Sequence, residues 1–375
     1  NNGLPDSFFY IDLESVEAGE LLSPQHIERE GAPSRAQRLL SDGDIIYQTV
    51  RPYQRNNLFC DFIGEDDYVA STGYAQLRAK GNERFLYQLI HTDSFVNKVL
   101  EKCTGSNYPA INSSALAKVR FAFPPDPAEQ QKIADCLGSL DRWISAAGRK
   151  LAALRDHKRG LLQQLFPKPG QSQPQQRFPE FRDAEKWKTV RLGKVIEEYR
   201  EKSTVQDEYE VLTSARKGLV RQIEYYGEGR ITGRDNVGFN VIPPNHITYR
   251  SRADDRRFYF NENDLGVTGI ISTYYPVFRV VDGSNKFFVE LLAQNSVTVG
   301  KYSVGTSQTV LSLPMLKKVK LSLPKAAEQQ KIAACLRALD AKVNAHAAQL
   351  DTLQQHKRGL MQQLFPSPET AVASS

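Results

Sequence analysis

Residues 128–169 read AEQQKIADCLGSLDRWISAAGRKLAALRDHKRGLLQQLFPKP, and residues 327–368 read AEQQKIAACLRALDAKVNAHAAQLDTLQQHKRGLMQQLFPSP. The two stretches agree at 25 of 42 positions without a gap, at a constant offset of 199 residues. Chance does not produce such agreement, so the chain consists of two tandem halves. In each half a variable block precedes a nearly constant one.

Each constant block carries the spacing of a coiled-coil helix. Its apolar residues recur at intervals of four and three over more than four heptads. The stripes consist of Ile133, Leu137, Leu140, Ile144, Leu151, Leu154, Leu161 and Leu165, and of Ile332, Leu336, Leu339, Val343, Leu350, Leu353, Leu360 and Leu364. Lys158 and Lys357 interrupt them, and prolines flank both helices. The alternative is a pair of ordinary core helices.

Two nearly identical helices in one chain are expected to pair with each other. A two-fold axis makes such a contact self-complementary, and an axis across the helices makes the pair antiparallel. A helix of about 35 residues is about 50 Å long. We therefore expect a spacer that holds the two variable blocks at its opposite ends.

The repeat divides the chain into six segments. They are a first variable domain (1–127), a first helix (128–166), a linker (167–186), a second variable domain (187–326), a second helix (327–366) and a tail (367–375). The second domain opens with WKTVRLG at 187–193, and the first has no such opening. We expect that the opening of the first domain is missing from this sequence.

Both variable blocks mix strand-like and helical segments. The strand-like runs lie at 44–50, 119–123, 245–249, 266–271, 277–281 and 319–323, and the helical segments at 83–102 and 286–297. The predicted fold class is therefore α+β: two tandem mixed α/β domains separated by two long antiparallel coiled-coil helices with pseudo-two-fold symmetry.

Composition narrows the class of protein. The 375 residues are 40% hydrophobic and 25% charged, with four cysteines, no apolar run of membrane-spanning length and no N-terminal signal pattern. We expect a soluble protein of the reducing cytoplasm. The net charge of +6 is uneven, because residues 187–326 hold 21 basic and 15 acidic residues whereas residues 1–127 hold 12 and 17. The basic excess favours a polyanionic partner.

Arginine, asparagine, glutamine and tyrosine gather in the loops of both blocks. Such side chains read base edges or bind phosphates, and the alternative is an ordinary polar loop surface. The candidate DNA-binding residues are Arg51, Tyr53, Gln54, Arg55, Asn56, Asn57, Ser106, Asn107, Tyr108, Ser214, Arg216, Lys217, Arg221, Tyr225, Tyr226, Arg230, Arg250, Arg252, Arg256, Arg257, Thr273, Tyr274, Tyr275, Lys301 and Tyr302.

No catalytic or metal-binding constellation stands out. The equivalent His157 and His356 belong either to a partner contact or to a solvated helix face. The cysteines form no CxxC pair, and we expect them to be reduced and without zinc. The glycines at 227, 229 and 233 have the wrong spacing for a nucleotide-binding loop.

Taken together, the two EQQKIA…HKRGL…QQLFP helices, each following a variable domain, and the W…V.LG opening at 187–193 resemble the DNA-specificity subunit of type I restriction-modification systems. The resemblance covers essentially the whole chain. It implies that each variable domain reads one half of a bipartite, asymmetric double-stranded DNA site. The paired helices would set the gap between the half-sites and dock two modification subunits.

The resemblance also implies that catalysis and cofactor binding belong to other subunits. The chain itself would have no catalysis and no cofactor. The modification subunits would bind S-adenosylmethionine and methylate adenine, and restriction subunits would use ATP and Mg²⁺ for translocation. Two alternatives remain at this point: a protein–protein scaffold with two binding heads, and an enzyme, against which the absence of a methyltransferase tetrapeptide argues.

Overall fold

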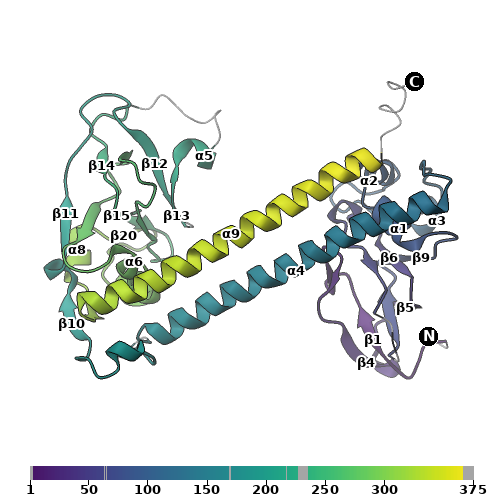
Figure 1. Ribbon diagram of the computed structural model, residues 1–375, viewed down its shortest axis with the longest axis horizontal. Coiled ribbons are helices and arrows are strands. Elements are labelled where there is room, and N and C mark those ends of the chain that lie inside the picture. The colour runs from purple at the N-terminus through teal and green to yellow at the C-terminus, as the bar shows by residue number, and fades with distance from the viewer. Residues whose placement is uncertain are drawn as a thin grey trace. The chain divides into compact units, whose positions relative to one another are not determined.

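A computed structural model describes residues 3–62, 64, 66–168, 170–216, 218–226 and 235–365. The chain forms two compact units: unit 1 comprises residues up to 149 and from 348 onward, and unit 2 comprises residues 150–347. Two long helices, α4 (Pro127–Leu165) and α9 (Ala326–Leu364), have 39 residues each and contribute to both units (Figure 1). Each unit thus combines one variable block with part of each constant helix.

The described residues of the variable block of unit 1 form two larger sheets, a two-stranded hairpin and three short α-helices. One sheet has the strand order β4-β1-β8-β5 and the other the order β7-β6-β9. The strands are β1 (Ser7–Ile11), β4 (Gln25–Glu28), β5 (Ala36–Leu39), β6 (Ile45–Gln48), β7 (Leu58–Phe59), β8 (Tyr68–Ser71) and β9 (Tyr74–Leu77), with a small hairpin of β2 (Val16–Glu17) and β3 (Glu20–Leu21). The helices are α1 (Glu83–Leu89), α2 (Asp93–Leu100) and α3 (Ser113–Leu116).

The helix expected at 83–102 is therefore two helices. Thr92 begins α2, because its hydroxyl accepts a hydrogen bond from the backbone N–H of Phe95 at 3.2 Å. The same side chain donates to the carbonyl of Leu89, which ends α1. One capping residue thus turns the chain between the two helices.

Unit 2 repeats this plan with more strands. One sheet has the order β11-β19-β15-β17 and another the order β13-β12-β18-β14, and two-stranded ladders join β10 to β21 and β16 to β20. The strands are β10 (Lys188–Arg191), β11 (Ile196–Tyr199), β12 (Glu210–Ala215), β13 (Gly218–Arg221), β14 (Asn240–Ile242), β15 (Ile247–Tyr249), β16 (Arg252–Ala253), β17 (Phe260–Glu262), β18 (Gly269–Ile271), β19 (Val277–Val280), β20 (Thr309–Val310) and β21 (Lys320–Leu323). The helices are α5 (Gln222–Tyr226), α6 (Asn285–Gln294), α7 (Ser296–Gly300) and α8 (Leu313–Lys318).

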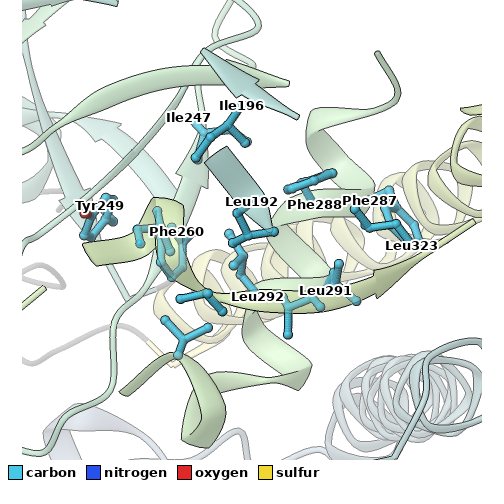
Figure 2. Close-up of a cluster of buried hydrophobic side chains, with 14 of the residues drawn as sticks. Leu192, Ile196, Ile247, Tyr249, Phe260, Phe287, Phe288, Leu291, Leu292 and Leu323 are labelled. Carbon is cyan, nitrogen blue, oxygen red and sulfur yellow. The ribbon is translucent and has the colours of Figure 1, made fainter. Parts of the chain in front are cut away.

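The core of unit 2 forms around α6. Its residues Phe287, Phe288, Leu291 and Leu292 are each at most 1% exposed, and Figure 2 shows them beside Leu192 and Leu323. Fully burying a side chain of this size contributes roughly 1.5–3 kcal/mol. The fold class expected from the sequence, tandem mixed α/β domains combined with long antiparallel helices, is confirmed.

A buried carboxylate ties the opening of the second domain to α9. Glu328 is 2% exposed and accepts two hydrogen bonds from Arg177, at 2.9 and 2.6 Å, and one from the indole N–H of Trp187 at 3.2 Å. The equivalent Glu129 of the first repeat is exposed, and its side chain bonds to no other described residue. The same motif residue therefore has two different environments.

One strand expectation is wrong. Residues 320–323 form β21 because β10 pairs with it, from Lys188 opposite Leu323 to Arg191 opposite Lys320. Residues 119–123 have a closely similar sequence, but they form no strand, and no described residue of unit 1 pairs with them. Phe121 and Phe123 are consequently 38% and 56% exposed.

The helix segments run antiparallel within each unit. In unit 1, residues of α4 from Ile133 to Leu137 share an apolar cluster with residues of α9 from Leu360 to Leu364, whereas Asp141 meets Lys357. In unit 2, Leu165 of α4 lies in the same cluster as Ile332 and Leu336 of α9. All sixteen stripe residues are buried or half-buried.

The two lysines that interrupt the stripes form ion pairs between the helices. In unit 1, the ammonium of Lys357 lies 2.5 Å from Asp141, which also accepts a hydrogen bond from Gln88 of α1 at 2.7 Å. In unit 2, Lys158 lies 2.6 Å from Asp340. Asp141 and Asp340 are equivalent positions of the repeat, as are Lys158 and Lys357. Each unit thus contains the same ion pair, with the helices exchanged.

The ion pair of unit 2 extends into α6. Lys286 contacts Asp340 at 2.7 Å and Glu290 at 2.9 Å. Burial by itself would raise the pKa of Asp340, but hydrogen bonds from Lys158 and Lys286 outweigh it, so the pKa lies below its ordinary value. The charges therefore hold a domain helix and both long helices together.

His91 lies between α1 and α2 of unit 1. Its Nδ1 donates to the carbonyl of Tyr87 at 2.7 Å, because a carbonyl can only accept, and this leaves Nε2 to accept from the amide of Asn57 at 3.2 Å. The pKa of His91 falls to about 4, mainly because the protein encloses the ring, and the nearby Lys357 and Arg55 act in the same direction. The neutral imidazole is therefore the form that fits the fold.

No helix among the described residues combines the length and the apolar character that a membrane crossing requires.

Reversing one charge of the unit 1 pair is expected to destabilise the protein. Asp141→Lys places two ammonium groups together between the helices and should lower the free energy of unfolding by about 2 kcal/mol. The double variant Asp141→Lys/Lys357→Asp should recover most of this loss in urea denaturation. Asp351→Lys, at an exposed position of α9, is the matched control. Equal losses in the single and the double variant would contradict the pairing.

Stability is also expected to fall in mild acid because of His91. Its folded pKa is about 4 and its unfolded pKa about 6.5, so the unfolded state takes up the proton first. The contribution is complete above pH 6.5 and is lost as the pH falls toward 4, by up to about 2 kcal/mol because the half-buried ring is partly screened by water. Thermal unfolding of His91→Gln between pH 7 and 4 should show a shallower pH dependence. His157→Gln, at an exposed helix position, is the matched control.

Candidate functional site

Two neighbouring loops of unit 1 bring together several of the residues predicted from the sequence. The segment 51–57 follows β6, and the segment 104–110 follows α2. Val50 forms a β-bridge with Ala110, and the backbone N–H of Arg51 donates to the carbonyl of Pro109 at 2.7 Å. The two loops therefore form one surface.

Arg51 and Tyr108 are the central contact of this surface. The guanidinium carbon lies 4.2 Å from the ring centroid of Tyr108, whose side chain is 64% exposed. The backbone of Arg51 has a φ of 54°, an uncommon value for a residue with a side chain. Its Nε is buried without a hydrogen-bond partner among the described residues. The arginine is thus held in place by stacking rather than by a carboxylate.

Other residues of segment 51–57 support the loop instead. Asn57 is 1% exposed, and its side-chain oxygen accepts a hydrogen bond from the backbone N–H of Gln48 at 2.8 Å. Arg55 forms an ion pair with Asp93 and donates to the carbonyl of His91 at 2.9 Å. Asn56 accepts a hydrogen bond from the backbone N–H of Ala18 at 3.2 Å. Tyr53 and Gln54 are exposed.

Unit 2 contains a corresponding pair of loops. β16 pairs with β20, so that Arg252 lies opposite Val310. Arg256 donates to the carbonyl of Gly305 at 3.2 Å. The loop 305–308, with Thr306, Ser307 and Gln308, was not among the predicted residues. These residues lie 200 positions after the predicted Ser106, Asn107 and Tyr108, close to the offset of 199 between the constant blocks, so the repeat itself carried the signal.

A third loop joins this surface through Tyr274. The guanidinium carbon of Arg252 lies 4.4 Å from the centroid of the Tyr274 ring, which is 57% exposed. The hydroxyl of Ser251 donates to the carbonyl of Tyr274 at 2.6 Å. Arg252, Arg256 and Tyr274 therefore share one face, and each unit has an arginine stacked on an exposed tyrosine.

A second group of predicted residues lies around β12, β13 and α5. Arg216 lies 5.5 Å from the Tyr259 ring centroid, and Ser214 accepts a hydrogen bond from Asn261 at 2.8 Å. Arg221 forms ion pairs with Glu210 and Glu224, at 2.9 and 3.3 Å. These ion pairs occupy the Arg221 guanidinium, whereas Arg216 has no carboxylate partner among the described residues.

The remaining predicted residues differ in exposure. Arg250, Arg257, Thr273, Lys301, Tyr225 and Tyr226 are exposed, as are Ser106 and Asn107, whereas Tyr275 and Tyr302 are half-buried. Lys217 and Arg230 lie outside the described residues, as does the glycine-rich stretch 227–233. His157 and His356 are exposed on α4 and α9.

The described residues hold no group of three or more histidine, cysteine or acidic side chains that could bind a metal ion. The cysteines are free, and Cys60 is buried. Burial, followed by nearby aspartates, raises the pKa of the Cys60 thiol to about 12, so it is protonated at neutral pH.

The type I restriction modification DNA specificity domain matches at residues 42–155 and 184–355. The MjaVIII specificity subunit of Methanocaldococcus jannaschii is 22% identical over 329 residues, which are 81% of this chain and 75% of that protein. The HindI specificity subunit of Haemophilus influenzae is 27% identical over 143 residues, 35% of this chain, and the match spans only 30% of that relative.

A solved structure has the same fold. It is the S subunit of a type I restriction-modification system from M. genitalium, with a TM-score of 0.54 and 15% identity, covering 96% of this chain and 89% of that one. The family match spans both variable domains and most of both helices, well over half of the sequence. The chain therefore belongs to the family of type I restriction-modification DNA-specificity subunits.

Proposed function

We propose that this chain selects the DNA target of a type I restriction-modification complex. Each variable domain reads one half of a bipartite, asymmetric site in double-stranded DNA. The observation that carries this proposal is the presence, in each unit, of an exposed loop surface where arginines stack on tyrosines beside uncharged polar side chains. Arginines bind phosphates and guanine, and amide and hydroxyl groups read base edges.

The paired helices connect the two reading surfaces. With a rigid connection, both surfaces can bind DNA at once, and so gain affinity, only when the half-sites are separated by the matching distance. Ion pairs at equivalent positions join the two helices within each unit, which supports a role for the helices as a pair. We propose that the helices set the length of the unread spacer.

The helices also dock two modification subunits in this proposal. Trp143 of α4 is 67% exposed, and exposed aromatic side chains frequently anchor protein–protein interfaces. The chain contributes specificity and no catalysis or cofactor. S-adenosylmethionine would bind to the modification subunits, and ATP and Mg²⁺ would serve the restriction subunits, all acting on DNA in the cytoplasm.

Methylation mapping tests the proposal directly. Cells that produce this chain with its modification subunit should methylate adenine on both strands of a single bipartite motif. Cells with the modification subunit alone should not. Absence of a new motif despite a purified complex of both subunits would contradict the DNA-reading function and favour a protein scaffold.

The salt dependence of DNA binding should locate the phosphate contacts. For the complex with the modification subunit, Arg252→Ala and Arg256→Ala should each weaken binding and lower the slope of log affinity against log salt by about 0.9. Arg279→Ala is the control, because Arg279 is paired with Glu197 at 2.7 Å on β19. An unchanged slope in both loop variants would place the DNA elsewhere.

A further inference from the structure

We infer that two equivalent loops, residues 105–108 of unit 1 and residues 305–308 of unit 2, read the bases of the two half-sites. The arginines beside each loop hold the DNA backbone. This inference rests on the proposed function and assigns a base-reading role to Thr306, Ser307 and Gln308. It also separates the predicted residues into base-reading and backbone-binding groups.

Both loops have the same backbone construction. Thr104 and Ala110 exchange both backbone hydrogen bonds, at 2.9 and 3.0 Å. Val304 and Val310 exchange the same two bonds, at 3.0 and 2.8 Å. Each pair closes a loop of five residues, so the residues at the tip have a fixed place relative to the domain.

A glycine makes each tight loop possible. Gly105 has a φ of +91° and Gly305 a φ of +112°, values that favour glycine. A Cβ at Gly105 would lie 2.9 Å from the carbonyl oxygen of Tyr108, and one at Gly305 would lie 2.4 Å from that of Gln308. The next three residues are exposed in both loops. The turn therefore presents three consecutive side chains to the solvent.

The arginine-bearing segment is attached to the base of each loop. In unit 1 the bridge from Val50 to Ala110 places Arg51 beside the loop, stacked on Tyr108. In unit 2, Arg252 lies opposite Val310, and Arg256 bonds to the carbonyl of Gly305. Positive charge thus lies next to both tips, where a bound duplex would place its phosphates while the tips reach its base edges.

The tip residues suit base reading, and they differ between the units. Unit 1 presents Ser106, Asn107 and Tyr108, and unit 2 presents Thr306, Ser307 and Gln308. All carry uncharged hydrogen-bonding groups, and asparagine and glutamine pair with adenine edges. Because the scaffolds agree and the tips do not, one construction can read two different half-sites.

Exchanging the tips tests the inference. The variant Ser106→Thr/Asn107→Ser/Tyr108→Gln places the unit 2 tip on unit 1, and Thr306→Ser/Ser307→Asn/Gln308→Tyr makes the reverse change. In methylation mapping with the modification subunit, each variant should change the bases accepted in one half-site only, with at least a tenfold change in relative preference. The other half-site and the spacer should stay as they are. Ser34→Thr/Gln37→Asn, at exposed positions of unit 1, is the control.

The outcomes separate the inference from the function on which it rests. Full methylation of the original motif by both exchange variants would overturn the role of the loops, and so would a change confined to the spacer. If an exchange variant abolishes methylation, the single variants Asn107→Ala and Gln308→Ala are used instead, and DNA binding by the assembled complex is measured. A tenfold fall in the ratio of target to non-target affinity supports the inference, and an unchanged ratio overturns it. Absence of a motif with the unchanged chain would instead contradict the proposed function.

Discussion

The contact between α4 and α9 is the constraint on which each unit depends. An apolar seam supplies the burial, and one aspartate–lysine pair in each unit crosses that seam. A half-buried ion pair adds little net stability, but it is costly to break, because the remaining charge loses its partner away from water. The pairs also reach Gln88 of α1 and Lys286 of α6, so each variable domain is attached to the helices through the same charges.

Equivalent residues of the repeat have different structures and environments in the two units, because the segments that contact them differ. Glu328 is buried under Arg177 and Trp187, whereas Glu129 is exposed. β21 exists because β10 supplies its hydrogen bonds, whereas residues 119–123 have no such partner among the described residues. A strand is a property of two segments, so the alternation of residues in one segment predicts it only when a second segment pairs with it.

The loop surfaces show how far residue type alone predicts a site. Arg51, Arg55, Asn56 and Asn57 were equivalent candidates by composition. The structure stacks Arg51 on Tyr108 at the surface but uses Arg55 and Asn57 to hold the loop through Asp93 and Gln48. Polar side chains in loops follow no periodicity, so their exposure depends on which backbone groups need partners. The loop 305–308 lacked arginine and tyrosine, and only its place in the repeat indicated it.

The sequence by itself determined the internal repeat, the two long helices, the α+β class and the family. Each of these is carried by local spacing or by direct comparison of residues, and these two signals do not depend on contacts between distant residues. Only the tertiary structure decided that Lys158 and Lys357 pair with Asp340 and Asp141, and which loop side chains are free to contact a ligand. Those features join residues as far as 216 positions apart, and their geometry follows from packing and hydrogen bonding between segments whose pairing no local pattern specifies.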